Sequence, residues 1–231
     1  MAREAAAEFA RLAAAACAAR GAFRVALSGG TTPRAAYEEL ADPRAAQARA
    51  IPWERVHVFF GDERQVAPDS EHSNARMASQ ALLRHVPIPM HQVHRIRGEN
   101  PDADRAAEEY EEILRDQFRL TGKELPRFDL VLLGMGADGH TASLFPGSQG
   151  LEERERLAIA TRAPVEPAGR ISLTLPVLNA AAAAIVLVTG AAKGSAYARV
   201  RAGADLPVAR VRPQDGSLLW LADRAAAGGS A

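Results

Sequence analysis

Cysteine is nearly absent from this sequence, since Cys17 is the only one among 231 residues. A single cysteine excludes an internal disulfide framework and any zinc module built from several thiolates. We therefore expect a reducing, cytoplasmic environment. Five of the six histidines lack metal-ligand spacing to nearby acids, so we expect structural or surface roles for them and no metal site. They are His57, His72, His85, His91 and His94.

Charge of one sign is not in excess either. Lys plus Arg and Asp plus Glu number 28 each, so the formal net charge is +0. Without a global electrostatic field, we expect neither nucleic acid nor an anionic membrane as a partner. No run of about 18 apolar residues is present, which argues against a membrane span. Residues 1–20 predict an amphipathic helix rather than a signal peptide, because charged side chains such as Glu8 and Arg11 interrupt the apolar residues.

Short apolar runs alternate with glycine-containing turns and with helical segments rich in Ala, Glu and Arg. This alternation is typical of βαβ units and predicts an α/β fold with a three-layer, doubly wound, mostly parallel sheet of the Rossmann-like kind. We expect strands at 23–28, 56–60, 128–133, 157–161, 170–175, 185–189 and 218–221, and helices at 33–40, 73–85, 102–119 and 191–202. Because no linker is evident, we expect one domain over 1–231, with a flexible tail at 225–231.

The loop after the first predicted strand has the composition of a phosphate site. In doubly wound sheets, ligands bind beyond the carboxyl ends of the strands. Here Gly29 and Gly30 allow close approach of the backbone, the Thr31 hydroxyl is a donor, and the following helix offers free N–H groups. The alternative is an ordinary tight turn with a threonine N-cap.

Two further loops carry ionisable side chains. Asp62 and Arg64 follow the strand at 56–60, and the alternative to a functional role there is a salt-bridged surface turn. The loop 134–141 (GMGADGHT) places Asp138 and His140 among three glycines, which indicates a candidate base rather than a structural histidine.

Two cations late in the chain complete the set of candidates. Arg170 and Lys193 each have a solvated surface position as the alternative. Lys193 lies in the first turn of a predicted helix, where the dipole disfavours a cation, so an anionic partner would explain it. No Gly-x-Ser-x-Gly elbow is present, and Cys17 lacks a plausible partner. The residues therefore indicate general-base chemistry on a small phosphorylated substrate, attacked by water or deprotonated at carbon.

Four of these segments, in order along the chain, resemble the 6-phosphogluconolactonase family. They are LSGGTTPRAAYEEL, VHVFFGDERQVAPDSEHSNARMA, FDLVLLGMGADGHTASLFPGS and TGAAKGSAY. The same superfamily contains the glucosamine-6-phosphate deaminases and isomerases, whose fold the resemblance implies here. In those enzymes the glycine-rich loop continues to Asn-Glu-Pro, whose glutamate takes part in the chemistry. This chain has Leu144-Phe145-Pro146 instead and has Arg64 after the acidic pair, and both departures favour hydrolysis.

The resemblance implies hydrolysis of 6-phospho-D-glucono-1,5-lactone to 6-phospho-D-gluconate, in the oxidative branch of the pentose phosphate pathway, without a cofactor. It implies that Gly29, Gly30, Thr31, Arg170 and Lys193 surround the phosphate. It also implies that His140 is the base, oriented by Asp138 or Asp62, with Arg64 near the sugar ring or the phosphate. The alternatives are an amino-sugar phosphate deaminase or isomerase and a non-catalytic sugar-phosphate sensor. We expect a monomer or a weak homodimer.

Overall fold

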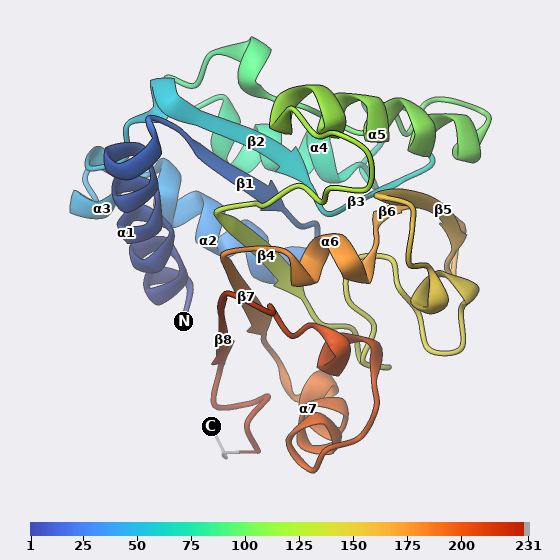
Figure 1. Ribbon diagram of the computed structural model, residues 1–231. Coiled ribbons are helices and arrows are strands. Elements are labelled where there is room, and N and C mark those ends of the chain that lie inside the picture. The colour runs from blue at the N-terminus through green and yellow to red at the C-terminus, as the bar shows by residue number, and fades with distance from the viewer. Residues whose placement is uncertain (229–231) are drawn as a thin grey trace.

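Five parallel strands form the central sheet, in the order β2-β1-β4-β7-β8. The computed structural model describes residues 1–228 (Figure 1). The strands are β1 (Phe23–Leu27), β2 (Val56–Phe60), β4 (Leu130–Gly134), β7 (Ala183–Val188) and β8 (Ser217–Ala222). Because β2 and β4 lie on opposite sides of β1, the loops after β1 and β4 diverge there. This reversal of strand order is the point at which doubly wound sheets bind ligands.

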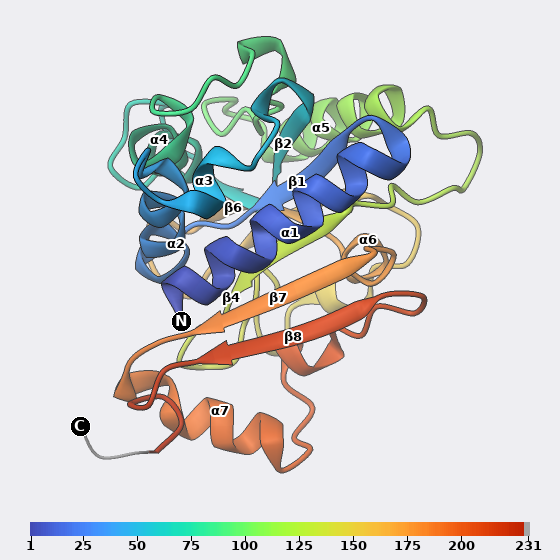
Figure 2. The same cartoon turned by 90° about the vertical axis from the view of Figure 1, so that its left-hand side faces the viewer.

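Helices cover both faces of this sheet, which confirms the predicted three-layer α/β fold. α1 (Ala2–Arg20) and α2 (Thr31–Ala41) pack together on one face. α5 (Ala103–Phe118) and α6 (Leu175–Asn179) lie on the other face, and α7 (Gly194–Arg201) lies beyond the carboxyl end of β7 (Figures 1 and 2).

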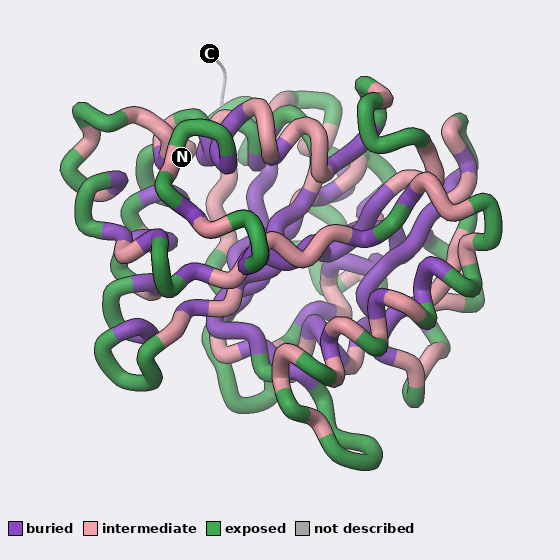
Figure 3. The backbone as a smooth tube through the Cα atoms, turned by 90° about the horizontal axis from the view of Figure 1, so that it is seen from above, coloured by how far each residue is buried: buried purple, intermediate pink, exposed green. Residues whose placement is uncertain are grey.

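The core lies between these layers. All six residues of β7 are buried, as expected for a strand covered on both faces. The predicted amphipathic helix at the start of the chain is confirmed, because α1 buries residues spaced by three and four, including Phe9, Ala13 and Cys17. Figure 3 shows buried segments through the interior and exposed loops around the outside.

A second, antiparallel sheet was not expected from the sequence. β3 (Asp62–Arg64), β6 (Gly169–Leu173) and β5 (Ala158–Arg162) pair in that order. The expectation of a plain loop at 61–64 is wrong, because three residues are too few for a periodic pattern and their partner strand lies far along the chain. β6 ends earlier than expected, since α6 begins at Leu175 with Pro176 in its first turn.

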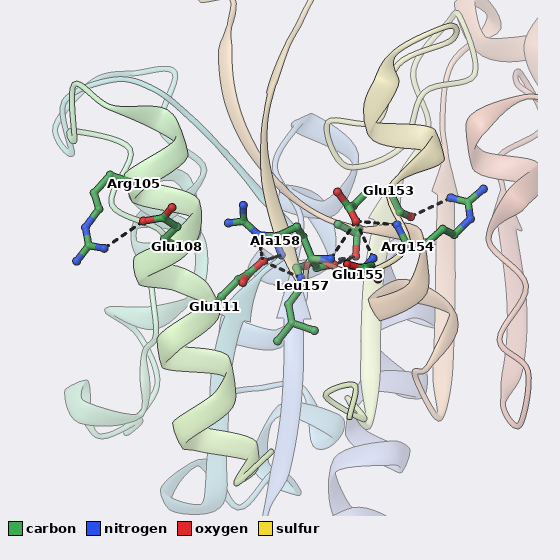
Figure 4. Close-up of polar contacts among 10 residues, drawn as sticks. Arg105, Glu108, Glu111, Glu153, Arg154, Glu155, Leu157 and Ala158 are labelled. Atoms are coloured by element: carbon green, nitrogen blue, oxygen red, sulfur yellow. Dashed lines mark hydrogen bonds and ion pairs between the residues drawn. The ribbon is translucent and has the colours of Figure 1, made fainter. Parts of the chain in front are cut away.

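A partly buried carboxylate, that of Glu111, fixes this small sheet to α5. Glu111 Oε1 accepts hydrogen bonds from Arg156 Nε at 2.7 Å, from the Leu157 amide at 2.8 Å and from the Ala158 amide at 3.1 Å (Figure 4). These bonds satisfy backbone donors at the start of β5 that would otherwise be buried without partners. Since β5 pairs with β6, the contact also sets the position of Arg170.

Other boundaries differ from the expectations at helix and chain ends. The helix expected at 73–85 is α4 (Asn74–Ala78) followed by a π-helical turn at 79–83. Residues 224–228 form a turn in which Ala226 is buried and its amide donates to Asp223 at 2.7 Å. The tail expected at 225–231 stays a prediction, because only Ala226 is buried among 225–228 and 229–231 lie outside the described residues. Within the described chain, no helix is long and apolar enough to cross a membrane.

Two histidines stack at the amino-terminal half of β2, away from the strand ends. The rings of His57 and His94 are parallel, with centroids 5.7 Å apart and His57 Nδ1 3.4 Å from His94 Nε2. Burial lowers the pKa of both rings, to about 4 for His94, and the positive charges of Arg24 and His91 lower both further. His57 also lowers the pKa of His94. Both imidazoles are therefore neutral in the folded protein near pH 7.

We predict that acid destabilises the fold through His94. The pKa of His94 is about 4 in the folded chain and about 6.5 in the unfolded chain. The stability that the neutral ring contributes is therefore fully present above about pH 6.5 and is lost as the pH falls toward 4. His94→Gln should reduce the loss of stability between pH 7 and pH 4.5 by on the order of 1 kcal/mol, after allowance for solvent screening of a half-exposed ring. Urea unfolding at both pH values measures this, and an unchanged loss would contradict it.

Candidate active site

The loops that follow β1, β2, β4 and β7 border one cavity of about 300 Å³. Eight of the nine residues predicted for the site line it: Gly29, Gly30, Thr31, Asp62, Arg64, His140, Arg170 and Lys193. The ninth, Asp138, lies behind His140 and lines a neighbouring hollow. The structure therefore gathers side chains that are up to 164 positions apart in sequence, from Gly29 to Lys193.

The glycine-rich loop after β1 packs directly against a side chain from α4. A Cβ atom at Gly29 would lie 1.8 Å from Asn74 Oδ1, so only glycine fits there. α2 begins at Thr31, and the first backbone N–H groups of a helix have no partner within it. The loop thus has backbone donors at the edge of the cavity, and binding of a phosphate there stays a prediction.

Two arginines lie directly opposite each other in the small sheet. Arg64 of β3 and Arg170 of β6 are partners in register. Burial lowers the pKa of Arg170, and the charge of Arg64 lowers it further. Their guanidinium groups donate to carbonyl oxygens, Arg64 to His72 at 2.5 Å and Arg170 to Gly169 at 3.0 Å and to Pro167. Like charges opposite each other destabilise a sheet, and an anion between them would relieve the repulsion.

Lys193 is half-buried at the end of a 3₁₀ turn at 191–193, immediately before α7. Burial lowers its pKa, and the negative charge of Asp223 opposes this effect. Within residues 1–228, none of the three cations of the cavity forms a salt bridge with a carboxylate. Their positive charge is available to a ligand.

His140 is held by the carboxylate of Asp138. Asp138 Oδ1 lies 2.6 Å from His140 Nδ1 and accepts the His140 amide at 3.1 Å. Burial acts to raise the pKa of Asp138, but the hydrogen bonds and charge of His140 outweigh it, and the pKa is lowered. An ionised Asp138 selects the tautomer with the proton on Nδ1, which leaves Nε2 as the proton acceptor of the ring. Of the two carboxylates left open by the sequence, Asp138 is the one in contact with His140.

Asp62 has different partners, which the sequence did not predict. Its Oδ2 accepts from Ser143 Oγ at 2.6 Å, and its Oδ1 accepts from Asn74 Nδ2 at 3.1 Å. Glu63 accepts the amides of Asn74 at 2.7 Å and Ala75 at 2.8 Å, so it caps α4 and sets the position of Asn74. Asn74 and Ser143 have no local sequence signal for this role, because they lie 12 and 81 residues from Asp62.

Comparisons with known proteins cover nearly the whole chain. The family model for glucosamine-6-phosphate isomerases and 6-phosphogluconolactonases matches residues 1–220. A 6-phosphogluconolactonase from a Nostoc species is 43% identical over 211 residues, which are 90% of this chain and 84% of the relative. The structure of 6-phosphogluconolactonase from Trypanosoma brucei has a TM-score of 0.83 at 31% identity, covering 99% of this chain and 95% of that one. A monomeric glucosamine-6-phosphate deaminase has a TM-score of 0.78 at 18% identity, over 99% and 96%, and shares the fold.

We predict that Gly136→Ala displaces the ring of His140. A Cβ atom at Gly136 would lie 2.2 Å from both Cε1 and Nδ1 of that ring. Turnover of the 6-phospholactone that the sequence implies should fall about tenfold or more, since misplacing a catalytic group by about 1 Å has such a cost. Ring ¹⁵N shifts of His140 should show loss of the single tautomer. Gly61→Ala is the control, because its Cβ would meet only Leu27 O at 3.6 Å. Equal effects of the two variants would contradict the prediction.

Proposed function

Because the chain belongs to the family of glucosamine-6-phosphate isomerases and 6-phosphogluconolactonases, we propose that His140 activates the water that opens its lactone substrate. The enzyme is a 6-phosphogluconolactonase, a carboxylic ester hydrolase of the pentose phosphate pathway. Its substrate is 6-phospho-D-glucono-1,5-lactone. The observation that carries the proposal is the Asp138–His140 pair at the wall of a cavity that also holds three cations, which form no salt bridge within residues 1–228.

The reaction begins with proton transfer to His140. Nε2 takes a proton from water while the water oxygen attacks the lactone carbonyl carbon. Asp138 stabilises the imidazolium that forms, through its bond to Nδ1. When the tetrahedral intermediate collapses, the bond from the carbonyl carbon to the ring oxygen breaks, and the imidazolium returns the proton to that oxygen. The products are a carboxylic acid, which ionises, and a regenerated neutral His140.

The negative charge of the intermediate requires donors. We assign this role to the Arg64 guanidinium and to backbone N–H groups of the two glycine-rich loops, which border the cavity with His140. We assign the phosphate to Arg170, Lys193 and the turn from Gly29 to Thr31. Asp62, fixed by Ser143 and Asn74, is an acceptor for a sugar hydroxyl. A δ-lactone is already reactive, so the proposal includes no metal and no redox cofactor.

Phe145 supports hydrolysis over deamination. Its ring centroid lies 4.6 Å from that of His140, so an apolar group stands where, by the resemblance, the deaminases carry a glutamate. A non-catalytic sensor is less consistent with the site, because binding alone does not require a histidine tautomer selected by a carboxylate. A cytoplasmic location and a monomer or weak homodimer remain predictions.

We predict that Arg170→Ala and Lys193→Ala each weaken binding of 6-phosphogluconate. Loss of one charge-assisted contact should cost about 1.5 to 3 kcal/mol, or roughly 10-fold to 150-fold in affinity. Isothermal titration calorimetry measures it directly. Lys123→Ala is the control, since Lys123 is 89% exposed and pairs with Glu155 on the surface. Binding by both site variants as tight as that of the parent would show that the phosphate lies elsewhere.

We predict that His140→Asn lowers kcat by about 10² to 10⁴ with little change in KM, because general-base help arises only in the transition state. Asparagine keeps a hydrogen-bonding group but cannot accept the proton. The assay follows acid release from 6-phosphogluconolactone with a pH indicator, after subtraction of spontaneous hydrolysis. A His140→Asn enzyme with most of the parental turnover would assign the base to another residue, with Asp62 and Glu63 the first to test.

A further inference from the structure

Two buried tyrosines make the same unusual contact at the ends of two neighbouring strands. The hydroxyl of Tyr37, from α2, accepts the Ser28 amide at 3.0 Å and donates to the Ser28 carbonyl at 2.9 Å. The hydroxyl of Tyr110, from α5, does the same at Phe60, with both distances 2.9 Å. The tyrosines are 0% and 1% exposed. Burial raises the pKa of both hydroxyls, so each keeps the proton that it donates.

The strand ladders explain why these backbone groups need partners. Leu27 O accepts from Gly61 N on the β2 side, so the N–H and C=O of the next residue, Ser28, point toward β4. The register between β1 and β4 extends only through Ala26 and Val131. Tyr37 therefore satisfies the donor and acceptor that the diverging strands leave unpaired.

Phe60 is in the corresponding position on the outer side of the sheet. β2 is an edge strand, and within the described residues its outer side is bridged at Val58 alone, by Val93. Tyr110 takes the place of a neighbouring strand for the last residue of β2. α2 and α5 lie on opposite faces of the sheet (Figures 1 and 2). Each helix thus holds one of two adjacent strand ends through one tyrosine hydroxyl.

The residues that follow the two contacts belong to the site. Ser28 is followed at once by Gly29, Gly30 and Thr31, and Phe60 is followed by Gly61 and then by β3 with Asp62 and Arg64. We propose that Tyr37 and Tyr110 are positioning residues for the reaction, Tyr37 for the phosphate-binding turn and Tyr110 for the segment that carries Arg64. The roles of the two loops rest on the proposed function.

The test is removal of each hydroxyl with the ring retained, as Tyr37→Phe and Tyr110→Phe. Tyr37→Phe should raise KM for 6-phosphogluconolactone and Kd for 6-phosphogluconate by about 3- to 10-fold, with kcat within twofold of the parent, because it loosens ground-state binding. Tyr110→Phe should lower kcat by about 3- to 10-fold with KM within twofold of the parent. A displaced Arg64 would stabilise the transition state less while changing ground-state binding little.

Two controls separate positioning from loss of stability. The chain has three tyrosines, and the third, Tyr197, packs on Trp220 and does not line the cavity, so Tyr197→Phe should leave kcat and KM unchanged. Phe23→Leu weakens the core at the opposite end of β1 and should lower stability without changing either constant. All assays are run where urea unfolding shows each variant fully folded.

Parental values of kcat and KM in both tyrosine variants would overturn the inference. The inference would also be overturned if the two variants changed kcat and KM in the same way. A parent enzyme without lactonase activity would instead overturn the proposed function. If a variant does not fold, ¹⁹F NMR of the parent labelled with 3-fluorotyrosine replaces it. Comparison with the spectra of the variants that fold assigns the Tyr37 and Tyr110 resonances. Saturation with 6-phosphogluconate should then shift both resonances. Resonances that do not shift would overturn the inference.

Discussion

The separation of β1 from β4 is the constraint on which the site depends. A parallel sheet with its strand order reversed at β1 cannot continue its ladder past the last paired residues, Ala26 and Val131. The two loops that leave these strands therefore part, and the cavity opens between them. The backbone N–H and C=O of Ser28, which this separation leaves without a strand partner, are satisfied by the hydroxyl of Tyr37. Asn74 fills the space beside Gly29 and fixes the turn from the other side.

Local signals in the sequence were sufficient for the main sheet and for the loops that end its strands. An apolar run followed at once by glycines, as at 128–136, predicts a buried strand. It also predicts a loop after that strand whose backbone can approach a ligand closely. The partners of Asp62 were not predictable in this way, because Ser143, which donates to it, is 81 residues away in the sequence. The same holds for β3, whose three residues become a strand only by pairing with β6. Contacts of this kind depend on the completed fold.

Within residues 1–228, the carboxylates of the site form no salt bridge with its cations. Asp62 is satisfied by a hydroxyl and an amide, Glu63 by backbone N–H groups, and Asp138 by His140. Each acid thus has hydrogen-bond donors that carry no permanent positive charge. Arg170 donates from Nη1 to two carbonyl oxygens, which carry no net charge and so do not neutralise it. A chain of zero formal net charge can in this way present a local positive field to a phosphorylated sugar.

The two arginines that face each other across β3 and β6 connect ligand binding to folding. In the absence of an anion, the folded chain carries the repulsion between them, whereas the unfolded chain does not. Under the proposed assignment of the phosphate to Arg170, a bound phosphate-bearing molecule would offset this repulsion, and its binding would add RT ln(1 + [L]/Kd) to the free energy of unfolding. The apparent stability of the enzyme is therefore set in part by the surrounding pool of sugar phosphates. Its lifetime in a cell would follow the supply of its own metabolites.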